Sequence, residues 1–111
     1  MVYLAEHPAL AVLEVRVHLE LPLELLPDDY VLMRALLPHE SIITVAALPD
    51  DPLAAGDTWL TAAATAVLRV PSVLVPHAWN LLLNPLHAAA DNARIGSVEP
   101  FQFDPRLVRP L

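Results

Sequence analysis

The strongest constraint on the fold lies in residues 70–90, an uncharged and mostly apolar stretch of the chain. It is long enough for a membrane-spanning helix, which needs about 20 residues. Pro71, Pro76 and Pro85 interrupt it, and each proline breaks a helix because it removes a backbone donor and clashes with the preceding turn. The stretch also carries several hydrogen-bonding side chains, which are Ser72, His77, Asn80, Asn84 and His87. We therefore expect short elements here and no membrane span.

The charge balance excludes one class of function. The chain of 111 residues has 13 acidic and 6 basic side chains, which give a formal net charge of −7. Sequence-independent binding to nucleic acid requires a cationic surface. We therefore expect no direct contact with DNA or RNA.

The apolar content suggests a protein partner. Hydrophobic residues make up 56% of the chain, above the roughly 45–50% that is usual for soluble domains. A chain of this length suits one domain with a single core, and the interior of such a domain is limited. We expect a partner, which could be a second copy in a homo-oligomer, to cover part of the apolar surface.

The expected compartment is the cytoplasm. The chain has no cysteine, so it forms neither disulfides nor thiolate metal sites, and this fits a reducing environment. Its first residues, MVYLAEHPAL, have no basic lead-in and no long apolar run, so they do not resemble a signal peptide.

Residues 9–21 carry two conflicting signals. Apolar and polar side chains alternate through the second half of this segment, which is the periodicity of a strand. Ala, Leu, Glu and Arg nevertheless favour helix, and Pro8 suits a first helical turn. We predict a helix, on which Arg16 pairs with Glu20 at four-residue spacing.

The rest of the chain mixes strands and helices without regular alternation. We expect strands at residues 2–5, 30–38, 72–76 and 93–103, and further helices at residues 58–68 and 77–84. Residues 39–49 fit either a second short strand or an edge segment. Residues 50–57 are expected to form a loop, with Gly56 as the turn residue and Asp57 as a helix cap. The fold class is therefore α+β, with a small mixed or antiparallel sheet as the core and flanking helices.

Residue spacing argues against three kinds of site. The five histidines form no pair at three- or four-residue spacing and join no acidic cluster, so we expect no metal site. Gly56 and Gly96 are the two glycines of the chain, which leaves no phosphate-binding loop and no dinucleotide fingerprint. Ser72 has no flanking glycines, so it does not form a nucleophile elbow.

Five polar positions each allow a purely structural interpretation. Glu14 has apolar neighbours, so its carboxylate either points to water or is held in a pocket that requires it. Ser72 could cap the backbone at a strand start, and Asn80 and Asn84 could cap a short helix or its turn. Tyr3 would by default be an amphipathic strand residue with its hydroxyl at the surface.

Five blocks of the sequence resemble the RES domain, the toxin half of a bacterial toxin–antitoxin family. They are VYLAEHPALAVLEVRVHL, LPDDYVLMRALLP, GDTWL, VLRVPSVLVPHAWNLLLNPLH and PFQFDPRL, in the family's order and over nearly the whole chain. The resemblance implies a fold like that of ADP-ribosyltransferase toxins. It also implies degradation of NAD⁺ at the nicotinamide–ribose bond, by hydrolysis or with phosphate as acceptor, and no further cofactor. A cognate helix-turn-helix antitoxin would bind the toxin and block its site.

The resemblance assigns roles to four residues. Glu14 and Ser72 correspond to the glutamate and serine after which the family is named, and Tyr3 matches a tyrosine of its site. Glu14 would stabilise the positive charge that develops on the ribose as the glycosidic bond breaks. Tyr3 would pack on nicotinamide or ribose. Ser72 and Asn80 would hydrogen-bond the nucleotide.

One part of the family pattern has no counterpart in this sequence. The family's arginine, suited to holding a pyrophosphate, lies upstream of the strand at residues 2–5, and none of the six arginines takes its place. We therefore interpret residues 1–111 as a single RES-like domain, similar to the C-terminal two-thirds of the family and lacking its N-terminal segment. A truncated gene, a start codon placed too late and an inactive relic all fit this pattern.

Two functions compete on this basis. The first is an NAD⁺-degrading toxin. The second is a truncated, non-catalytic RES copy that binds an antitoxin or another RES chain, which the high apolar content favours. A third interpretation is a plain α+β domain whose resemblance to the family is misleading. Loss of NAD⁺ in the presence of the purified protein would distinguish the first function from the others.

Overall fold

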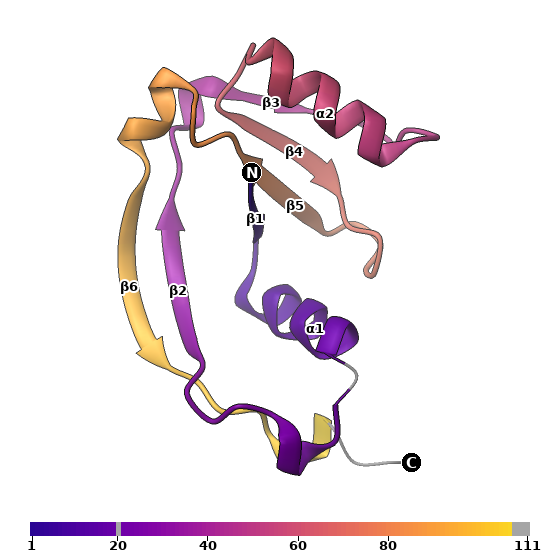
Figure 1. Ribbon diagram of the computed structural model, residues 1–111, viewed down its shortest axis with the longest axis vertical. Coiled ribbons are helices and arrows are strands. Elements are labelled where there is room, and N and C mark those ends of the chain that lie inside the picture. Colours follow the sequence, from indigo (N-terminus) through magenta and orange to yellow (C-terminus); the bar gives the residue numbers. More distant parts are fainter. Residues whose placement is uncertain (20, 108–111) are drawn as a thin grey trace.

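Two β-sheets organise the computed structural model, which describes residues 1–19 and 21–107 (Figure 1). The larger sheet has the order β1-β5-β4-β3, in which β3 and β4 are parallel and the other pairs antiparallel. Its strands are β1 (Val2–Ala5), β3 (Ile42–Thr44), β4 (Val67–Pro71) and β5 (Trp79–Leu83). The smaller sheet is the antiparallel pair of β2 (Val31–Leu36) and β6 (Arg94–Pro100). Together with two α-helices, these sheets confirm the α+β class and the mixed sheet.

The helix α1 (Pro8–Leu19) confirms the helical interpretation of this segment. Proline occupies its first position, where the absent N–H would have had no partner in any case. The Nδ1 atom of His7 accepts a hydrogen bond from the Ala9 N–H and so caps the first turn. Leu10 and Glu14, one helical turn apart, are buried. These two residues define the buried face of the helix. The alternation of apolar and polar side chains along the sequence does not indicate this face.

The tail after β6 returns to α1. Its described part contains the short 3₁₀ helix η4 (Pro105–Leu107). The Arg16 Nε donates a hydrogen bond of 3.3 Å to the Leu107 carbonyl, so the tail lies beside α1. The ion pair expected between Arg16 and Glu20 lies outside the described residues. Three further 3₁₀ turns are η1 (Leu23–Leu25), η2 (His39–Ser41) and η3 (Ala88–Asn92).

The helix α2 (Pro52–Ala62) corrects two expectations. The segment expected to be a loop is helical, and Gly56 and Asp57 lie inside the helix. The cap is Asp51, whose Oδ1 accepts a hydrogen bond of 3.1 Å from the Ala54 N–H. An aspartate followed by proline at the first helical position is a strong start signal, and it outweighs the single glycine in the helix.

The β4–β5 hairpin corrects the expected strand at residues 72–76 and the expected helix at residues 77–84. Residues 72–78 form the turn, and the strands lie on either side of it. Pro71 ends β4 rather than preceding a strand. In β5, buried residues alternate with half-buried ones, and the buried residues are Asn80 and Leu82. Asn80 of this strand was mistaken for a helix cap. The last expected strand shortens to β6, and β3 provides the short strand left open for residues 39–49.

The core of the larger sheet is small. Trp59 of α2 packs against Leu68 and Leu82, and half-buried Val45, Leu60 and Val70 surround them. The indole N–H of Trp59 donates a hydrogen bond to Thr65 Oγ1, which satisfies its polar end.

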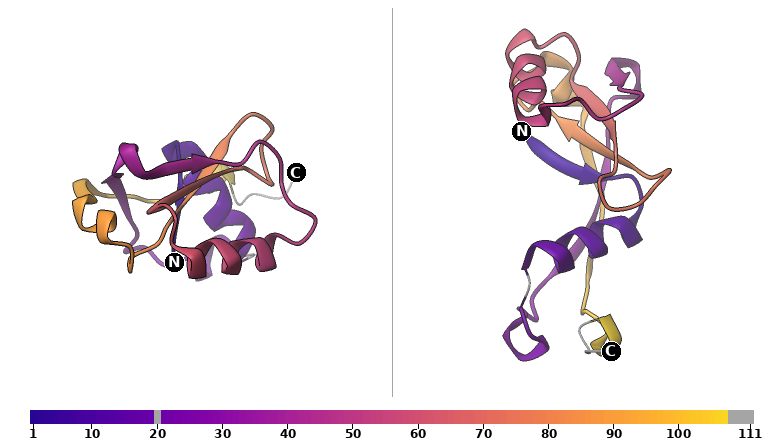
Figure 2. Two further views of the ribbon diagram at one scale, coloured as in Figure 1. Left: turned by 90° about the horizontal axis from the view of Figure 1, so that it is seen from above. Right: turned by 90° about the vertical axis from the view of Figure 1, so that its right-hand side faces the viewer.

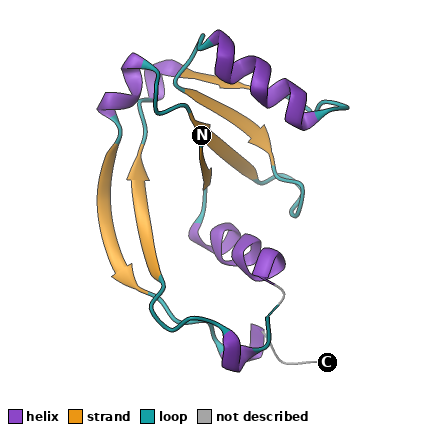
Figure 3. Ribbon diagram, in the orientation of Figure 1, coloured by secondary structure: helices purple, strands orange, loops and turns teal. Residues whose placement is uncertain are grey.

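The β2–β6 pair forms an arm beside this core, and the two helices lie apart from one another (Figures 2 and 3). The extents of the molecule are 43 × 33 × 22 Å. No helix of the described part is long and apolar enough to cross a membrane.

Candidate active site

Glu14 and Asn80 form a buried polar pair. Glu14 on α1 is 8% exposed and Asn80 on β5 is fully buried. The Asn80 Nδ2 donates a hydrogen bond of 2.7 Å to Glu14 Oε1 and a second of 3.2 Å to the Leu4 carbonyl of β1. Three elements therefore meet at this pair. Of the two interpretations of Glu14, exposure to water is wrong and burial holds.

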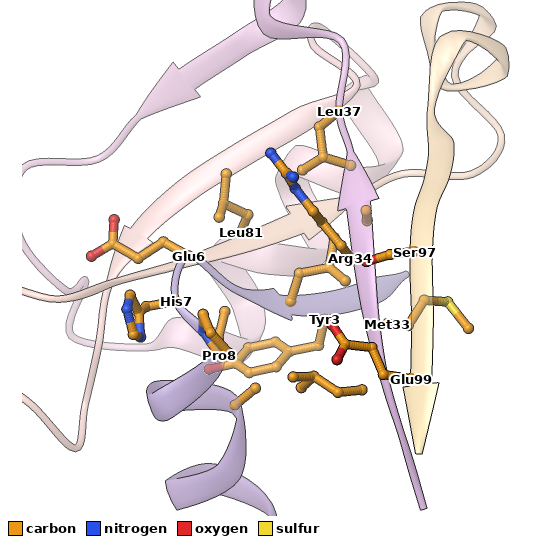
Figure 4. Close-up of a pocket in the computed structure, with 15 residues that line it drawn as sticks. Tyr3, Glu6, His7, Pro8, Met33, Arg34, Leu37, Leu81, Ser97 and Glu99 are labelled. Atoms are coloured by element: carbon orange, nitrogen blue, oxygen red, sulfur yellow. The ribbon is translucent and has the colours of Figure 1, made fainter. Parts of the chain in front are cut away.

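Tyr3 lies beside this pair. It is directly opposite Leu82 in the sheet, while Asn80 is opposite Ala5, so Tyr3 and Asn80 share one face. Its ring lies next to Pro8 at the start of α1 (Figure 4). Partial burial raises the pKa of the Tyr3 hydroxyl, and the negative charge of Glu14 raises it further. The phenol therefore stays protonated at neutral pH and keeps a hydrogen to donate. Half of the residue remains exposed.

Ser72 lies in the hairpin turn near Asn80. Its Oγ accepts hydrogen bonds of 3.1 Å from the Leu74 and Val75 N–H groups, and its own N–H donates to the Ala78 carbonyl. The hydroxyl therefore caps the backbone, as one interpretation expected, although in a turn rather than at a strand start. Asn80 is paired with Val70, so Ser72 lies two residues beyond that partner, on the same face. Within the described chain, Ser72 has no hydrogen bond to Glu14 or Asn80.

A cavity of about 580 Å³ opens between β1 and the β2–β6 arm. Apolar residues of both sides line it, together with polar groups shown in Figure 4: Tyr3, Glu6, His7, Arg34, Ser97 and Glu99. Of the four predicted site residues, Tyr3 reaches this cavity, and Glu14, Ser72 and Asn80 do not line it. The structure thus brings Tyr3, Glu14 and Asn80 together and leaves Ser72 in the neighbouring turn.

The cavity residues of β2 and β6 were not predicted from the sequence as site residues. Arg34 is opposite Ser97, and Leu32 is opposite Glu99, so all four project from one face of the arm. In a strand at residues 30–38, the side chains of Met33 and Arg34 point to opposite sides. The sequence does not show that the side of Arg34 faces β1, because that depends on the position of the arm.

Glu6 joins the start of α1 to the hairpin. Its Oε1 accepts a hydrogen bond of 3.1 Å from the Trp79 N–H, and its Oε2 lies 3.7 Å from Nη2 of Arg69. The Arg69 guanidinium stacks on the Trp79 ring at 4.0 Å. These contacts fix β5 next to the entry of α1, so that the side chains of residues 14 and 80 meet. Among the described residues, no group of three or more His, Asp or Glu side chains is arranged to hold a metal ion.

The model of the RES domain family matches residues 1–104, so the chain belongs to the RES domain family. Three curated relatives have names that describe them as toxins. A "Prs ADP-ribosylating toxin" of Sphingobium sp. (strain YBL2) is 35% identical over 121 aligned residues, which cover 98% of this chain and 75% of the relative. Proteins named "Toxin Res" from Pseudomonas putida and Yersinia enterocolitica are 37% and 34% identical; each alignment covers 96% of this chain, and 79% and 76% of the relative.

Proposed function

We propose that this chain is a RES-type toxin that acts on NAD⁺ and breaks the bond between nicotinamide and ribose. The observation that carries the proposal is the buried Glu14 carboxylate, held by Asn80 beside the protonated Tyr3. As the bond breaks, positive charge develops on the ribose. A carboxylate fixed in a largely dry site stabilises that charge more strongly than water does.

The other residues take supporting roles in this proposal. The Tyr3 ring is half exposed at the cavity, where it packs on the nicotinamide or ribose. Ser72 Oγ accepts two backbone hydrogen bonds, so its own hydroxyl hydrogen is available for an oxygen of the nucleotide. The nucleotide contact expected for Asn80 stays a prediction, and both amide hydrogens of Asn80 are already donated within the protein.

The acceptor completes the reaction. Nicotinamide leaves with the electron pair of the broken bond, and an acceptor oxygen bonds to the ribose carbon and releases its proton. Water gives ADP-ribose and phosphate gives a phosphorylated ADP-ribose. The name of the Sphingobium relative describes ADP-ribosylation, which breaks the same bond and transfers the ADP-ribose to an acceptor. We therefore propose which bond breaks, and the product shows whether water, phosphate or another group is the acceptor.

Unpaired strand edges support the expected further segment. In the described part of the chain, β1 pairs with β5 alone and β2 with β6 alone, and both strands line the cavity. An unpaired edge accepts an added strand. We propose that an upstream segment carrying the family's arginine pairs here and supplies a guanidinium for the pyrophosphate. We further propose a helix-turn-helix antitoxin that covers the site, and a cytoplasmic location.

The experiment mixes NAD⁺ and phosphate with the purified chain, and with a version extended through its upstream reading frame. Chromatography should show free nicotinamide together with ADP-ribose or its phosphorylated form. Absence of nicotinamide with both versions would rule the proposal out.

A non-catalytic interaction module is the second candidate. The chain exposes 7804 Å², whereas a compact monomer of 12.1 kDa exposes about 6,000 Å². This excess is about twice the roughly 800 Å² that each partner buries in a standard interface. This candidate expects co-purification with an antitoxin and no effect of Glu14→Ala on growth inhibition. Toxicity that disappears with Glu14→Ala would contradict it.

A further inference from the structure

We infer that Asn80 is a positioning residue that acts through Glu14 and does not itself bind the nucleotide. The inference rests on the proposed role of Glu14 in breaking the glycosidic bond. It starts from the buried amide of Asn80, whose two hydrogens are both donated within the described chain.

The orientation of this amide is fixed by its partners. The Nδ2 group faces Glu14 Oε1 and the Leu4 carbonyl oxygen, and both are acceptors. A flipped amide would place its oxygen against two other oxygens. The Asn80 side chain is fully buried, so neither of its two hydrogens is left for a ligand in the cavity.

The Oδ1 atom of Asn80 is fully buried and lacks a hydrogen-bond partner in the described structure. A buried acceptor without a donor destabilises the folded state. An apolar side chain at this position would avoid that cost if Glu14 were also apolar. The amide is therefore better explained by its contact with Glu14 than by stability.

The two oxygens of Glu14 have different surroundings. Oε1 receives the Asn80 N–H, and Oε2 has no hydrogen-bond partner among the described residues. Asn80 thus holds one oxygen from the inner side and leaves the other for the ribose hydroxyls. This arrangement orients the carboxylate before the substrate arrives.

The first test replaces Asn80 by aspartate, with Asn84→Asp as the matched control. Asn84 is also buried, but it bonds Leu60 and Leu86 rather than a carboxylate. Two carboxylates at positions 14 and 80 must share a proton to remain close. We expect Asn80→Asp to lower kcat for nicotinamide release about 10²-fold near pH 8, and to recover activity towards about pH 5.5 as the shared proton binds. Asn84→Asp should show no such recovery at acid pH. A variant Asn80→Asp with normal kcat and raised KM would instead make Asn80 a nucleotide ligand and overturn the inference.

The second test needs no catalytic activity. Asn80→Leu leaves the Glu14 carboxylate buried without a donor, so its unfolding temperature should fall. Adding Glu14→Leu should raise that temperature again, because the unpaired charge is removed. Additive losses from the two substitutions would contradict the coupling. If neither the chain nor its extended version releases nicotinamide, the proposed function fails, and this thermal cycle still decides whether Asn80 holds Glu14.

Discussion

The carboxylate of Glu14 has few protein partners for a buried charge. Burial of a charge is unfavourable unless other groups solvate it, and in the described chain the one donor to Glu14 is Asn80. The helix α1 buries Glu14 one turn after Leu10, and β5 brings Asn80 to it from 66 residues further along the sequence. A ligand with hydroxyl donors would complete the solvation of this carboxylate.

Alkaline pH tests the raised pKa of the Tyr3 hydroxyl. The pKa of the Tyr3 hydroxyl is raised by partial burial and, to a smaller extent, by the Glu14 charge. Stability from a raised pKa is fully present below the ordinary value of 10.0 and is lost as the pH rises through the folded-state value. Between about pH 9 and pH 11, wild-type protein should therefore lose more stability than Tyr3→Phe, by less than about 1 kcal/mol because the residue is half exposed. Urea titrations at both pH values measure this, and equal losses would count against a raised pKa of the Tyr3 hydroxyl.

Single residues of the site were predictable to different degrees. The resemblance identified Tyr3, Glu14, Ser72 and Asn80, and three of these meet in the structure. Sequence alone left open whether Glu14 is buried, because its neighbours along the chain do not reveal the β5 side chain that contacts it. The cavity residue Arg34 was not identified, since it reaches the site through the placement of the whole β2–β6 arm.

Local sequence patterns predicted helices and strands correctly where these patterns agreed with the burial of the segment in the fold. Residues 8–19 and 2–5 formed the expected helix and strand. The prediction failed for β5, where Asn80 was interpreted as a cap although it is a buried polar residue of an inner strand. Asn84 does cap the turn after this strand, because its Oδ1 accepts a hydrogen bond from the Leu86 N–H. The helix α2 started earlier than expected because the Asp51–Pro52 start signal was interpreted as part of a loop. Tertiary burial decided both segments against local propensity.

The end of α2 offers a direct test of its boundary. Ala63 follows the helix with φ 51°, a left-handed conformation, and its N–H bonds the Trp59 carbonyl. A non-glycine residue is strained in this conformation, whereas glycine adopts it freely. Ala63→Gly should therefore raise the free energy of unfolding by up to about 1 kcal/mol. The control Ala62→Gly, inside the helix, should lower it by about 0.5–1 kcal/mol. Thermal unfolding measures both changes, and destabilisation by Ala63→Gly would place the end of α2 elsewhere.

At the scale of the whole molecule, the chain is more open than its length requires. The radius of gyration is 15.5 Å, whereas a compact domain of this length has about 13 Å. Every residue of β6 is exposed, and large apolar side chains such as Met33, Ile95 and Val98 are exposed on the arm. Part of the apolar surface that suggested a partner is therefore exposed on the two-stranded arm.

Hydrogen exchange should reveal this division of the molecule. A two-stranded sheet with little core support is marginally stable, and weakly packed segments open before the core. Peptides that cover residues 31–36 and 94–100 should therefore exchange faster than those that cover residues 67–71 and 79–83. Mass spectrometry of the isolated chain measures this. Equal protection of both sheets would show that the arm is as stable as the core.

The most direct measurement of the central claim compares nicotinamide release by wild-type protein and by Glu14→Gln. Glutamine keeps an oxygen that can accept the Asn80 N–H, so the variant should fold normally, but it lacks the negative charge. The account predicts a rate lower by about 10²–10³-fold in the variant, the usual loss when one transition-state stabilising group is removed. Equal rates for two equally folded proteins would contradict it.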